Sequence, residues 1–457
     1  MPAGVVIETQ SVAGKCDRRS PGPIRAGLPA FGFLLLGLVA CGQALPPKPD
    51  IYLIVIDSLR KDHVGAYGYE RDTTPRMDTL AQAGLLFENV IAQSSWTLPS
   101  MASLMTSRHP PIIPAGSPVA LDPSALTLAE ILREHGYDTV SITTNPYNVE
   151  PVNLMQGFDR RRLRIAAPAS WVVDRMLEYL TGRSREKDAG PLFAYLHFMD
   201  VHDPIAPPPP YDGLFPGDRV EPGVAAEKAR ITALYDGALR FIDSEIGRLV
   251  DHLESRSSGS PFVLMITSDH GEEFWDHTAL GEELGLASVG AREVYGRGHG
   301  HTLFPELIEV PLVIAGSGIP SGRRPSRVRL IDLAPTLLGI AGVKAPEFSP
   351  LGVDLLGDHG SGGLADLPAL SETRTSAADQ ASLRQGGMQI YRIGDRNFQF
   401  EWDSERGFAP STTGVSPEGL DALERLRNLD ARVRMGEPVA LTPELREQLI
   451  ELGYIEE

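Results

Sequence analysis

The sequence predicts an α/β protein with a mainly parallel central sheet, helices on both faces of that sheet, and a small C-terminal α+β subdomain. Apolar runs of strand length alternate with helical segments through most of the chain, which is the pattern of a parallel sheet. The run 51–56, IYLIVI, is apolar throughout, as in a central strand that helices cover on both faces. A length of 457 residues suffices for one large domain and a smaller companion.

Composition excludes some classes of protein. The net charge of -18 argues against a nucleic-acid partner, which normally meets a basic surface. Cys16 and Cys41 both lie in the first tenth of the chain, so the folded body has no thiol nucleophile, disulfide or cysteine metal site. Any metal site there must use oxygen and imidazole ligands.

The first 41 residues are expected to be a signal peptide of the lipoprotein type. Arginines between 18 and 25 precede an apolar run, 30–40, that is too short to span a bilayer but suits the core of a signal. The stretch 38–42, LVACG, resembles a bacterial lipobox, in which Cys41 would be lipidated. The alternative is an ordinary secretory signal with an incidental cysteine.

We therefore expect a lipid-anchored bacterial lipoprotein of the cell envelope, on the periplasmic or outer-surface face, held to the membrane through Cys41. Residues 42–49, GQALPPKP, would form a proline-rich tether. The forty residues before Cys41 exceed a typical signal, which leaves a translation start downstream of Met1 open. The folded chain would divide into a catalytic domain, 50–357, and a C-terminal subdomain, 358–457.

The remaining elements follow from apolar spacing and from capping residues. We predict helices at 74–83, 124–135, 225–253 and 332–341, three of them closed by glycines 84, 136 and 342, and strands at 138–144, 192–198, 262–267 and 310–315. A glycine-serine linker at 360–363 would lead to strands within 389–402.

Thr97 stands at the predicted start of a short buried helix. The segment Thr97-Leu98-Pro99-Ser100 has a proline in the first helical turn, where proline is tolerated. That position would put the Thr97 hydroxyl beside free backbone N–H groups, which favour a nearby anion. Taken alone, a Thr-x-Pro-Ser segment more often only caps a helix.

Polar residues also follow three of the predicted strands. Asp57 comes at the carboxyl end of 51–56, the edge at which open α/β sheets bind ligands. Asp269 and His270 directly follow 262–267, and His202 lies just beyond 192–198. A glycine-rich loop, 296–302, offers His299 and His301. Each of these could equally be an ordinary turn or a solvated loop.

Taken in order, these segments resemble the sulfatase family of the alkaline phosphatase superfamily. The matching stretches cover about two-thirds of the chain: 56–60, 74–87, 97–106, 197–204, 267–272, 299–311 and 331–342. The resemblance implies an alkaline-phosphatase-like sheet and an anionic ester substrate.

The resemblance also implies roles for individual residues. Asp57, Asp269 and His270 would hold a divalent metal, with Thr97 as a further ligand at the position of the nucleophile. A metal lowers the pKa of a bound hydroxyl and neutralises charge at the reacting centre. An imidazole ligand favours manganese or zinc over calcium, although calcium and magnesium are left open.

The substrate's oxygens or leaving group would be contacted by histidines. The resemblance assigns this role to His202 and His299, with His301 as the alternative because the alignment of the loop is ambiguous.

Two departures from the family pattern shape the predicted activity. Sulfatases convert a Cys or Ser in Cys/Ser-x-Pro-x-Arg to formylglycine, but here Thr97 and Met101 occupy the first and last positions, so no formylglycine is expected. A second aspartate after the first strand is replaced by Ser58. This pattern resembles a threonine-nucleophile branch that hydrolyses or transfers phosphate esters.

We therefore expect a metal-dependent hydrolase or transferase that favours phosphate esters and diesters over sulfate esters. One alternative is a sulfuric ester hydrolase, similar to arylsulfatases, that works without formylglycine. Another is a catalytically inactive, surface-anchored binding protein on a sulfatase scaffold, because a fold does not guarantee a function.

Overall fold

The computed structural model describes eleven stretches of the chain: 7–10, 47–113, 118–185, 189–217, 222–256, 260–285, 296–359, 364–375, 378–403, 407–429 and 432–452. Apart from 7–10, the expected signal peptide with Cys41 lies outside the described residues, and so does the expected linker 360–363. Among the residues that are described, no helix has the length and apolar character needed to cross a bilayer.

A sheet of nine strands forms the centre of the described chain. Its order is β1 (Ile7–Gln10), β6 (Arg160–Leu163), β5 (Asp138–Thr143), β7 (Leu192–Phe198), β2 (Asp50–Ile56), β8 (Phe262–Thr267), β11 (Glu309–Gly316), β3 (Leu85–Ile91) and β12 (Gly322–Arg329). The strands from β6 to β8 run parallel, whereas β11 is antiparallel to both of its neighbours. The prediction of a mainly parallel sheet is confirmed.

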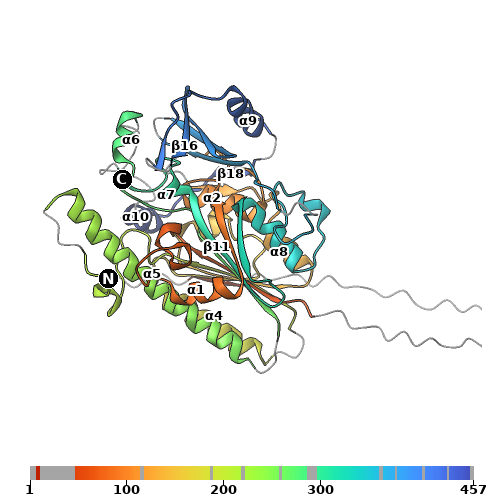
Figure 1. Ribbon diagram of the computed structural model, residues 1–457. Coiled ribbons are helices and arrows are strands. Elements are labelled where there is room, and N and C mark those ends of the chain that lie inside the picture. The colour runs from red at the N-terminus through yellow and green to blue at the C-terminus, as the bar shows by residue number, and fades with distance from the viewer. Residues whose placement is uncertain are drawn as a thin grey trace, which may run out of the picture.

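Helices cover both faces of this sheet (Figure 1). On one face, alternate residues of β2 such as Ile54 pack against α1 (Pro75–Ala83), α4 (Ala169–Arg183) and α5 (Val224–Ser255). On the other face, residues such as Leu53 pack with α2 (Thr97–Thr106), α3 (Leu128–Glu134) and α8 (Leu333–Ile340). Burying each such side chain contributes about 1.5–3 kcal/mol, so β2 stabilises the domain from both faces at once.

Most predicted elements lie where the apolar pattern placed them, and one helix start does not. β7 and β8 have the predicted bounds. The helix predicted to begin at Ser124 begins instead at Leu128, because Thr127 caps it. The Thr127 hydroxyl accepts from the backbone N–H of Glu130, and the Glu130 carboxylate accepts from the backbone N–H of Thr127. The earlier start was wrong by four residues.

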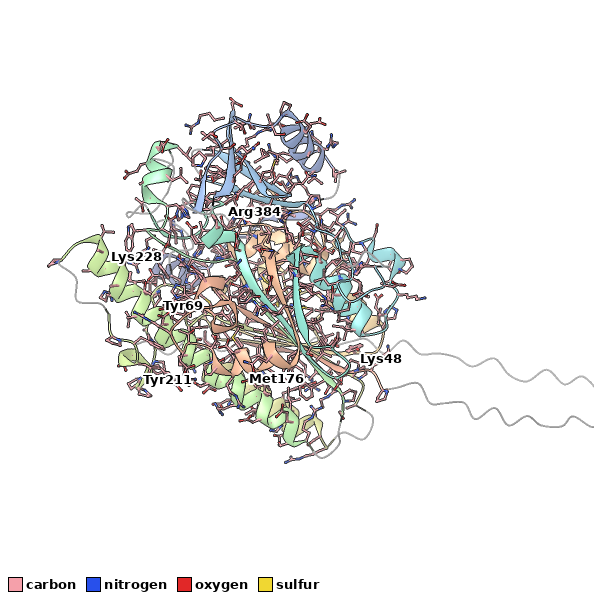
Figure 2. The ribbon with its side chains drawn as sticks, viewed as in Figure 1. Lys48, Tyr69, Met176, Tyr211, Lys228 and Arg384 are labelled. Atoms are coloured by element: carbon pink, nitrogen blue, oxygen red, sulfur yellow. The ribbon has the colours of Figure 1, made fainter. Side chains whose placement is uncertain are left out.

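The C-terminal part carries a separate antiparallel sheet, which lies at the top of Figure 1 with α9 beside it. Its strands follow one another in order: β13 (Ala369–Arg374), β14 (Asp379–Gln385), β15 (Met388–Ile393), β16 (Arg396–Asp403) and β17 (Gly407–Pro410), with α9 (Pro417–Arg427) packed on one face. Arg384, which is labelled in Figure 2, joins this sheet to the main one through an ion pair with Glu309. The predicted small C-terminal α+β subdomain is confirmed as an architecture.

After that sheet the chain returns to the main domain. β18 (Met435–Pro438) pairs with β4 (Val119–Leu121), and Leu449 of α10 (Pro443–Glu451) belongs to the main hydrophobic core. The domain boundary at 358 stays a prediction. The other short elements are β9 (Glu273–Phe274), α6 (Thr278–Glu283), β10 (Arg297–Gly298) and α7 (Pro305–Ile308).

Candidate active site

The candidate site lies where three neighbouring parallel strands end. β2 runs between β7 and β8, so the carboxyl ends of all three meet at one edge of the sheet. Asp57 directly follows β2, and its backbone N–H donates to the carbonyl of Phe198 in β7. Asp269 and His270 directly follow β8. The topology thus brings together residues that are more than two hundred positions apart in the sequence.

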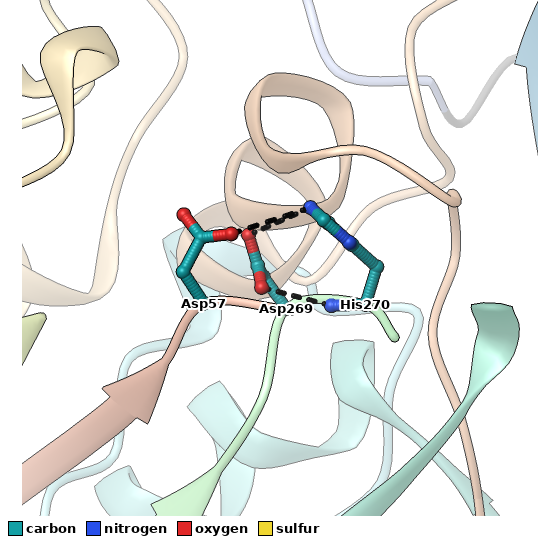
Figure 3. A group of neighbouring side chains, drawn as sticks. All are labelled: Asp57, Asp269 and His270. Carbon is teal, nitrogen blue, oxygen red and sulfur yellow. Dashed lines mark hydrogen bonds and ion pairs between the residues drawn. The ribbon is translucent and has the colours of Figure 1, made fainter. Parts of the chain in front are cut away.

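Asp57, Asp269 and His270 form a compact, fully buried cluster (Figure 3). The Nε2 atom of His270 lies 3.4 Å from Oδ2 of Asp269 and 3.7 Å from Oδ1 of Asp57. One ligand atom from each residue falls within 4.8 Å of the other two. This spacing is what a single bound cation requires, because its ligands surround one point.

The donor atoms of this cluster fit a divalent metal. Nδ1 of His270 donates to the carbonyl of Gly271 at 2.8 Å, which turns the lone pair of Nε2 toward the two carboxylates. Oδ2 of Asp269 is buried and has no hydrogen-bond partner among the described residues. A buried, unpaired carboxylate oxygen is costly unless a cation neutralises it. Carboxylate oxygens and imidazole nitrogens are both common ligands of divalent metals.

The charges in the cluster act on one another. Burial raises the pKa of Asp269, and the neighbouring Asp57 carboxylate raises it further. Burial also opposes ionisation of Asp57, but the His197 side chain and the nearby histidines 202 and 270 outweigh it and lower the pKa of Asp57. Burial disfavours a charged His270, yet the two carboxylates raise its pKa. The cluster therefore attracts positive charge.

Thr97 reaches the cluster from the first residue of α2. The residue before it, Trp96, has extended backbone angles and forms the N-cap, so the Thr97 hydroxyl does not cap the helix. Oγ1 of Thr97 lies 3.2 Å from Nε2 of His270 and 3.5 Å from Oδ2 of Asp57. The side chain is 1% exposed. The hydroxyl thus sits beside both the candidate metal ligands and the N-terminus of a buried helix.

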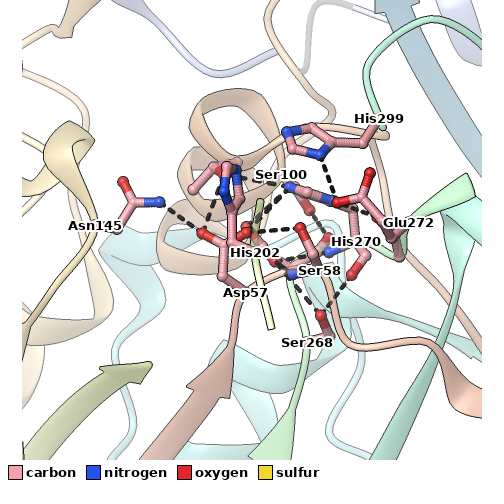
Figure 4. A network of polar contacts seen from close by, with 12 residues as sticks. Asp57, Ser58, Ser100, Asn145, His202, Ser268, His270, Glu272 and His299 are labelled. Carbon is pink, nitrogen blue, oxygen red and sulfur yellow. Dashed lines mark hydrogen bonds and ion pairs between the residues drawn. The ribbon is translucent and has the colours of Figure 1, made fainter. Parts of the chain in front are cut away.

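Serine hydroxyls and backbone groups hold these elements in place (Figure 4). Ser100 of α2 donates to the carbonyl of Asp269 at 2.6 Å, which fixes the helix start against the end of β8. Ser58 has a left-handed backbone conformation, with φ of 59°. Its hydroxyl donates to Asp57 at 3.0 Å and its N–H to Asp269 at 3.2 Å. Ser58 therefore orients two aspartates where the family pattern has a further carboxylate.

The ring of His299 lies between those of His270 and His202. The ring of His299 is 4.3 Å from that of His270 and 5.0 Å from that of His202, measured between ring centroids. Nδ1 of His202 donates to the carbonyl of Asp203 at 2.6 Å. Nδ1 of His299 lies 3.1 Å from Oε2 of Glu272. Both imidazoles thus use Nδ1 inside the protein, as His270 does.

His301 lies elsewhere. Its Nε2 pairs with Oε2 of Glu273 at 2.6 Å, and its carbonyl accepts from the Gln380 amide of the C-terminal sheet. The pairing of β9 with β10 sets Gly298 opposite Glu273, which places the two histidines of this loop in different surroundings. The structure therefore brings His299 to the cluster and keeps His301 at the border of the C-terminal sheet.

Two buried residues at the site are absent from the set predicted by the sequence. Nδ2 of Asn145 donates to Oδ2 of Asp57 at 2.6 Å, and Nε2 of His197 lies 3.4 Å from the same oxygen. Asn145 follows β5 by two residues, so the strand-end rule that selected Asp57 could have selected it. His197 stands inside an apolar strand, and nothing in the sequence distinguishes it from a core residue.

The fold of this sheet is similar to that of a solved Vibrio parahaemolyticus protein of the alkaline phosphatase superfamily, with a TM-score of 0.60 at 18% identity over 84% of this chain and 86% of that one. Residues 49–343 match the family model described as Sulfatase, which covers more than half of the chain. The chain therefore belongs to the sulfatase family.

Among curated proteins, human iduronate 2-sulfatase is 22% identical over 397 residues, a match that covers 66% of this chain and 70% of that protein. Bovine arylsulfatase A is 36% identical over 108 residues, covering 22% of this chain and 21% of that protein. The chain thus matches only about a fifth of the length of that relative.

Solved structures agree on the fold. The phosphonate monoester hydrolase of Silicibacter pomeroyi superposes with a TM-score of 0.63 at 18% identity, over 83% of this chain and 94% of that one. At this identity the likeness establishes the fold and leaves the substrate to be argued from the site.

Proposed function

We propose that this protein is a metal-dependent hydrolase or transferase of phosphate esters, with diesters favoured, that uses Thr97 as its nucleophile. The observation that carries the proposal is the position of the Thr97 hydroxyl, 3.2 Å from Nε2 of His270 and 3.5 Å from Oδ2 of Asp57. Asp57, Asp269 and His270 are the residues that would hold the cation. When bound, a divalent cation would lower the pKa of that hydroxyl and offset negative charge on the ester.

The first step forms a bond between Oγ1 of Thr97 and phosphorus and breaks the bond to the leaving alcohol. The proton of the hydroxyl is lost, and the leaving oxygen gains a proton. Opening of the phosphothreonine then needs a second attack on phosphorus, by water for hydrolysis or by an acceptor alcohol for transfer. Threonine cannot form the aldehyde hydrate by which formylglycine eliminates sulfate, so phosphorus suits it better than sulfur.

The charges around the site favour a group that carries one negative charge. The side chains with the strongest effect on the pKa of Asp57 and Asp269 are histidines and the two carboxylates themselves, rather than arginine or lysine. A phosphate monoester with two charges is usually bound by guanidinium or ammonium groups. A diester has a single charge, which one cation and imidazole donors can balance.

His202 and His299 are proposed to contact the substrate. Since both use Nδ1 within the protein, Nε2 is the atom that we assign to the ester oxygens or the leaving group. One of them would donate the proton that the leaving alcohol needs. His301 is not part of this proposal, because its Nε2 pairs with Glu273.

A sulfate ester remains the second candidate substrate. The Sulfatase family model favours it, and so do the two curated relatives named above, which are both sulfatases by name. Against it stands the threonine at the nucleophile position. A binding protein without activity is the third reading of the chain.

The test compares turnover of bis-para-nitrophenyl phosphate with that of para-nitrophenyl sulfate at equal concentrations of enzyme and Mn²⁺. We expect the phosphodiester to react faster, and Thr97→Val to abolish that turnover. Thr106→Val is the matched control, because Thr106 is a buried threonine at the other end of the same helix. Faster sulfate hydrolysis would favour the second candidate, and no turnover of either ester would favour the binding protein.

We also propose that the protein is anchored to the membrane through a lipidated Cys41. The support is the lipobox-like stretch 38–42 and the tether that follows it. Wild type and Cys41→Ser should differ in their membrane fraction, with the variant released. Equal partitioning of the two, or a mature N-terminus elsewhere, would contradict the anchor.

A further inference from the structure

The two oxygens of Asp57 face different surroundings. Oδ1 lies on the side of the cluster, 3.7 Å from Nε2 of His270, and accepts from the Ser58 hydroxyl. Oδ2 lies on the side of β7, where Asn145 donates to it at 2.6 Å (Figure 4), and the Thr97 hydroxyl lies 3.5 Å from it. His197 approaches the same oxygen at 3.4 Å. The residues completely buried here are Asp57, Ser58, His270, Asn145 and His197.

The orientation of His197 is fixed from behind. Its Nδ1 lies 2.8 Å from the hydroxyl of Tyr195 and 3.4 Å from Nδ2 of Asn148, both of which can donate a hydrogen. Nε2 lies 3.4 Å from Oδ2 of Asp57 and has no hydrogen-bond partner among the described residues. A lone pair on Nε2 would face a buried carboxylate oxygen, which is repulsive. Nε2 therefore carries the hydrogen on the side of Asp57, while Nδ1 accepts from Tyr195.

We propose that Asn145 and His197 are positioning residues that hold Asp57 by Oδ2, and thereby direct Oδ1 to the cation. This inference rests on the proposed function, because it assumes that Asp57 is a metal ligand. Neither residue would touch the substrate or the metal. Their role would be that of the partners that orient ligands in other metal sites, whose loss typically weakens metal binding 10- to 100-fold.

The three strands explain why this arrangement is rigid. Asn145 follows β5 and His197 belongs to β7, and these two strands lie side by side next to β2. The Asn145 side chain also accepts from the backbone N–H of Tyr147, which fixes its amide. Without fixed partners, a carboxylate at a strand end could rotate and exchange hydrogen-bond donors between its two oxygens. Two N–H groups anchored in neighbouring strands remove that freedom before the metal arrives.

The test measures Mn²⁺ binding to the purified protein by titration calorimetry, without any substrate. Asn145→Leu removes the donor at nearly constant volume and should weaken Mn²⁺ binding 10- to 100-fold. Tyr195→Phe removes only the hydroxyl behind His197 and should weaken it by a smaller factor. In turnover assays with saturating Mn²⁺, both variants should keep KM and lower kcat, because the substrate contacts are unchanged.

Tyr52→Phe is the matched control, since Tyr52 is a buried tyrosine in the neighbouring strand β2 and its hydroxyl lies near Arg256 instead. It should bind Mn²⁺ as the wild type does. Equal affinity in wild type, Asn145→Leu and Tyr195→Phe would overturn the inference and leave the proposed function standing. Equal weakening in the Tyr52→Phe control would also overturn it. A wild type that binds no Mn²⁺ would overturn both.

Discussion

The two ends of β2 each carry a buried aspartate, and the two are neutralised differently. At the amino end, Asp50 pairs with the guanidinium of Arg256 at 2.8 Å and accepts from the backbone N–H of Leu192. At the carboxyl end, Asp57 stands beside Asp269, among amide, imidazole and hydroxyl groups. Asp50, a structural carboxylate, is thus balanced by a cationic side chain of the protein itself. The candidate catalytic pair is instead the one that we propose binds a cation from solution.

A third aspartate, which is half-buried, shows another arrangement. Asp200, just beyond β7, accepts from the backbone N–H of Ala169 at 3.0 Å, while its Oδ2 is buried without a hydrogen-bond partner among the described residues. Burial and the charge of Glu245 raise the pKa of Asp200 to about 7. Asp50 is thus paired with an arginine, we propose a cation for Asp57, and a raised pKa favours the protonated form of Asp200. We interpret the aspartates balanced by an arginine or a proton as structural, and the aspartate proposed to bind a cation as catalytic.

The largest effect should come from removing a carboxylate at the catalytic end. Asp269→Asn should lower turnover of the phosphodiester by at least about 10³-fold, because it removes a charged ligand and its electrostatic contribution. Asp50→Asn should keep turnover and instead lower the free energy of unfolding by about 1–3 kcal/mol, because Arg256 loses its partner. Kinetic assays and denaturant titrations of both variants measure the difference. Full activity in metal-free Asp269→Asn would contradict the metal site.

The stabilisation of the protein by metal should depend on Asp57 at the carboxyl end of β2 and not on Asp50 at the amino end. At a free Mn²⁺ concentration of a hundred times Kd, binding adds about 2.7 kcal/mol to the free energy of unfolding. Wild type and Asp50→Asn should both lose this increment when EDTA is added. Asp57→Asn should show no such loss. Calorimetric melting with and without EDTA compares the three proteins, and an equal EDTA effect in Asp57→Asn would contradict the assignment of that ligand.

The last effect concerns pH. The pKa of Asp200 is about 7 in the folded state and near 3.8 in the unfolded chain, so the folded state binds more protons between these values. Stability from this group is present below about pH 4 and falls as pH rises toward 7. Asp200→Asn should flatten the pH dependence of the free energy of unfolding in this window, at most by about 4 kcal/mol for three pKa units. An unchanged profile in Asp200→Asn would show that this carboxyl does not titrate there.

The sequence predicts most of the framework because that framework depends on local apolar patterns. The strands ending at Asp57 and Asp269 are short apolar runs followed by polar residues, and both lie where they were predicted. The start of α3 was misplaced, although the capping pair Thr127 and Glu130 could have corrected it.

Other features depend on which strands become neighbours, and a single sequence does not show that. Asn145 and His197 gain their role only because β5, β7 and β2 lie side by side. The choice between His299 and His301 depends on how β9 pairs with β10. These contacts join distant parts of the chain, so local patterns do not reveal them.

The central claim is that Thr97 attacks the ester. It is tested most directly by mixing the enzyme with the aryl phosphodiester, quenching it with acid within one turnover, and mapping the protein by mass spectrometry. A phosphorylated Thr97 in the wild type, with no modification in Thr97→Val, is the predicted result. Phosphate on another residue, or a Thr97→Val variant that turns over the diester as fast as the Thr106→Val control, would contradict the account.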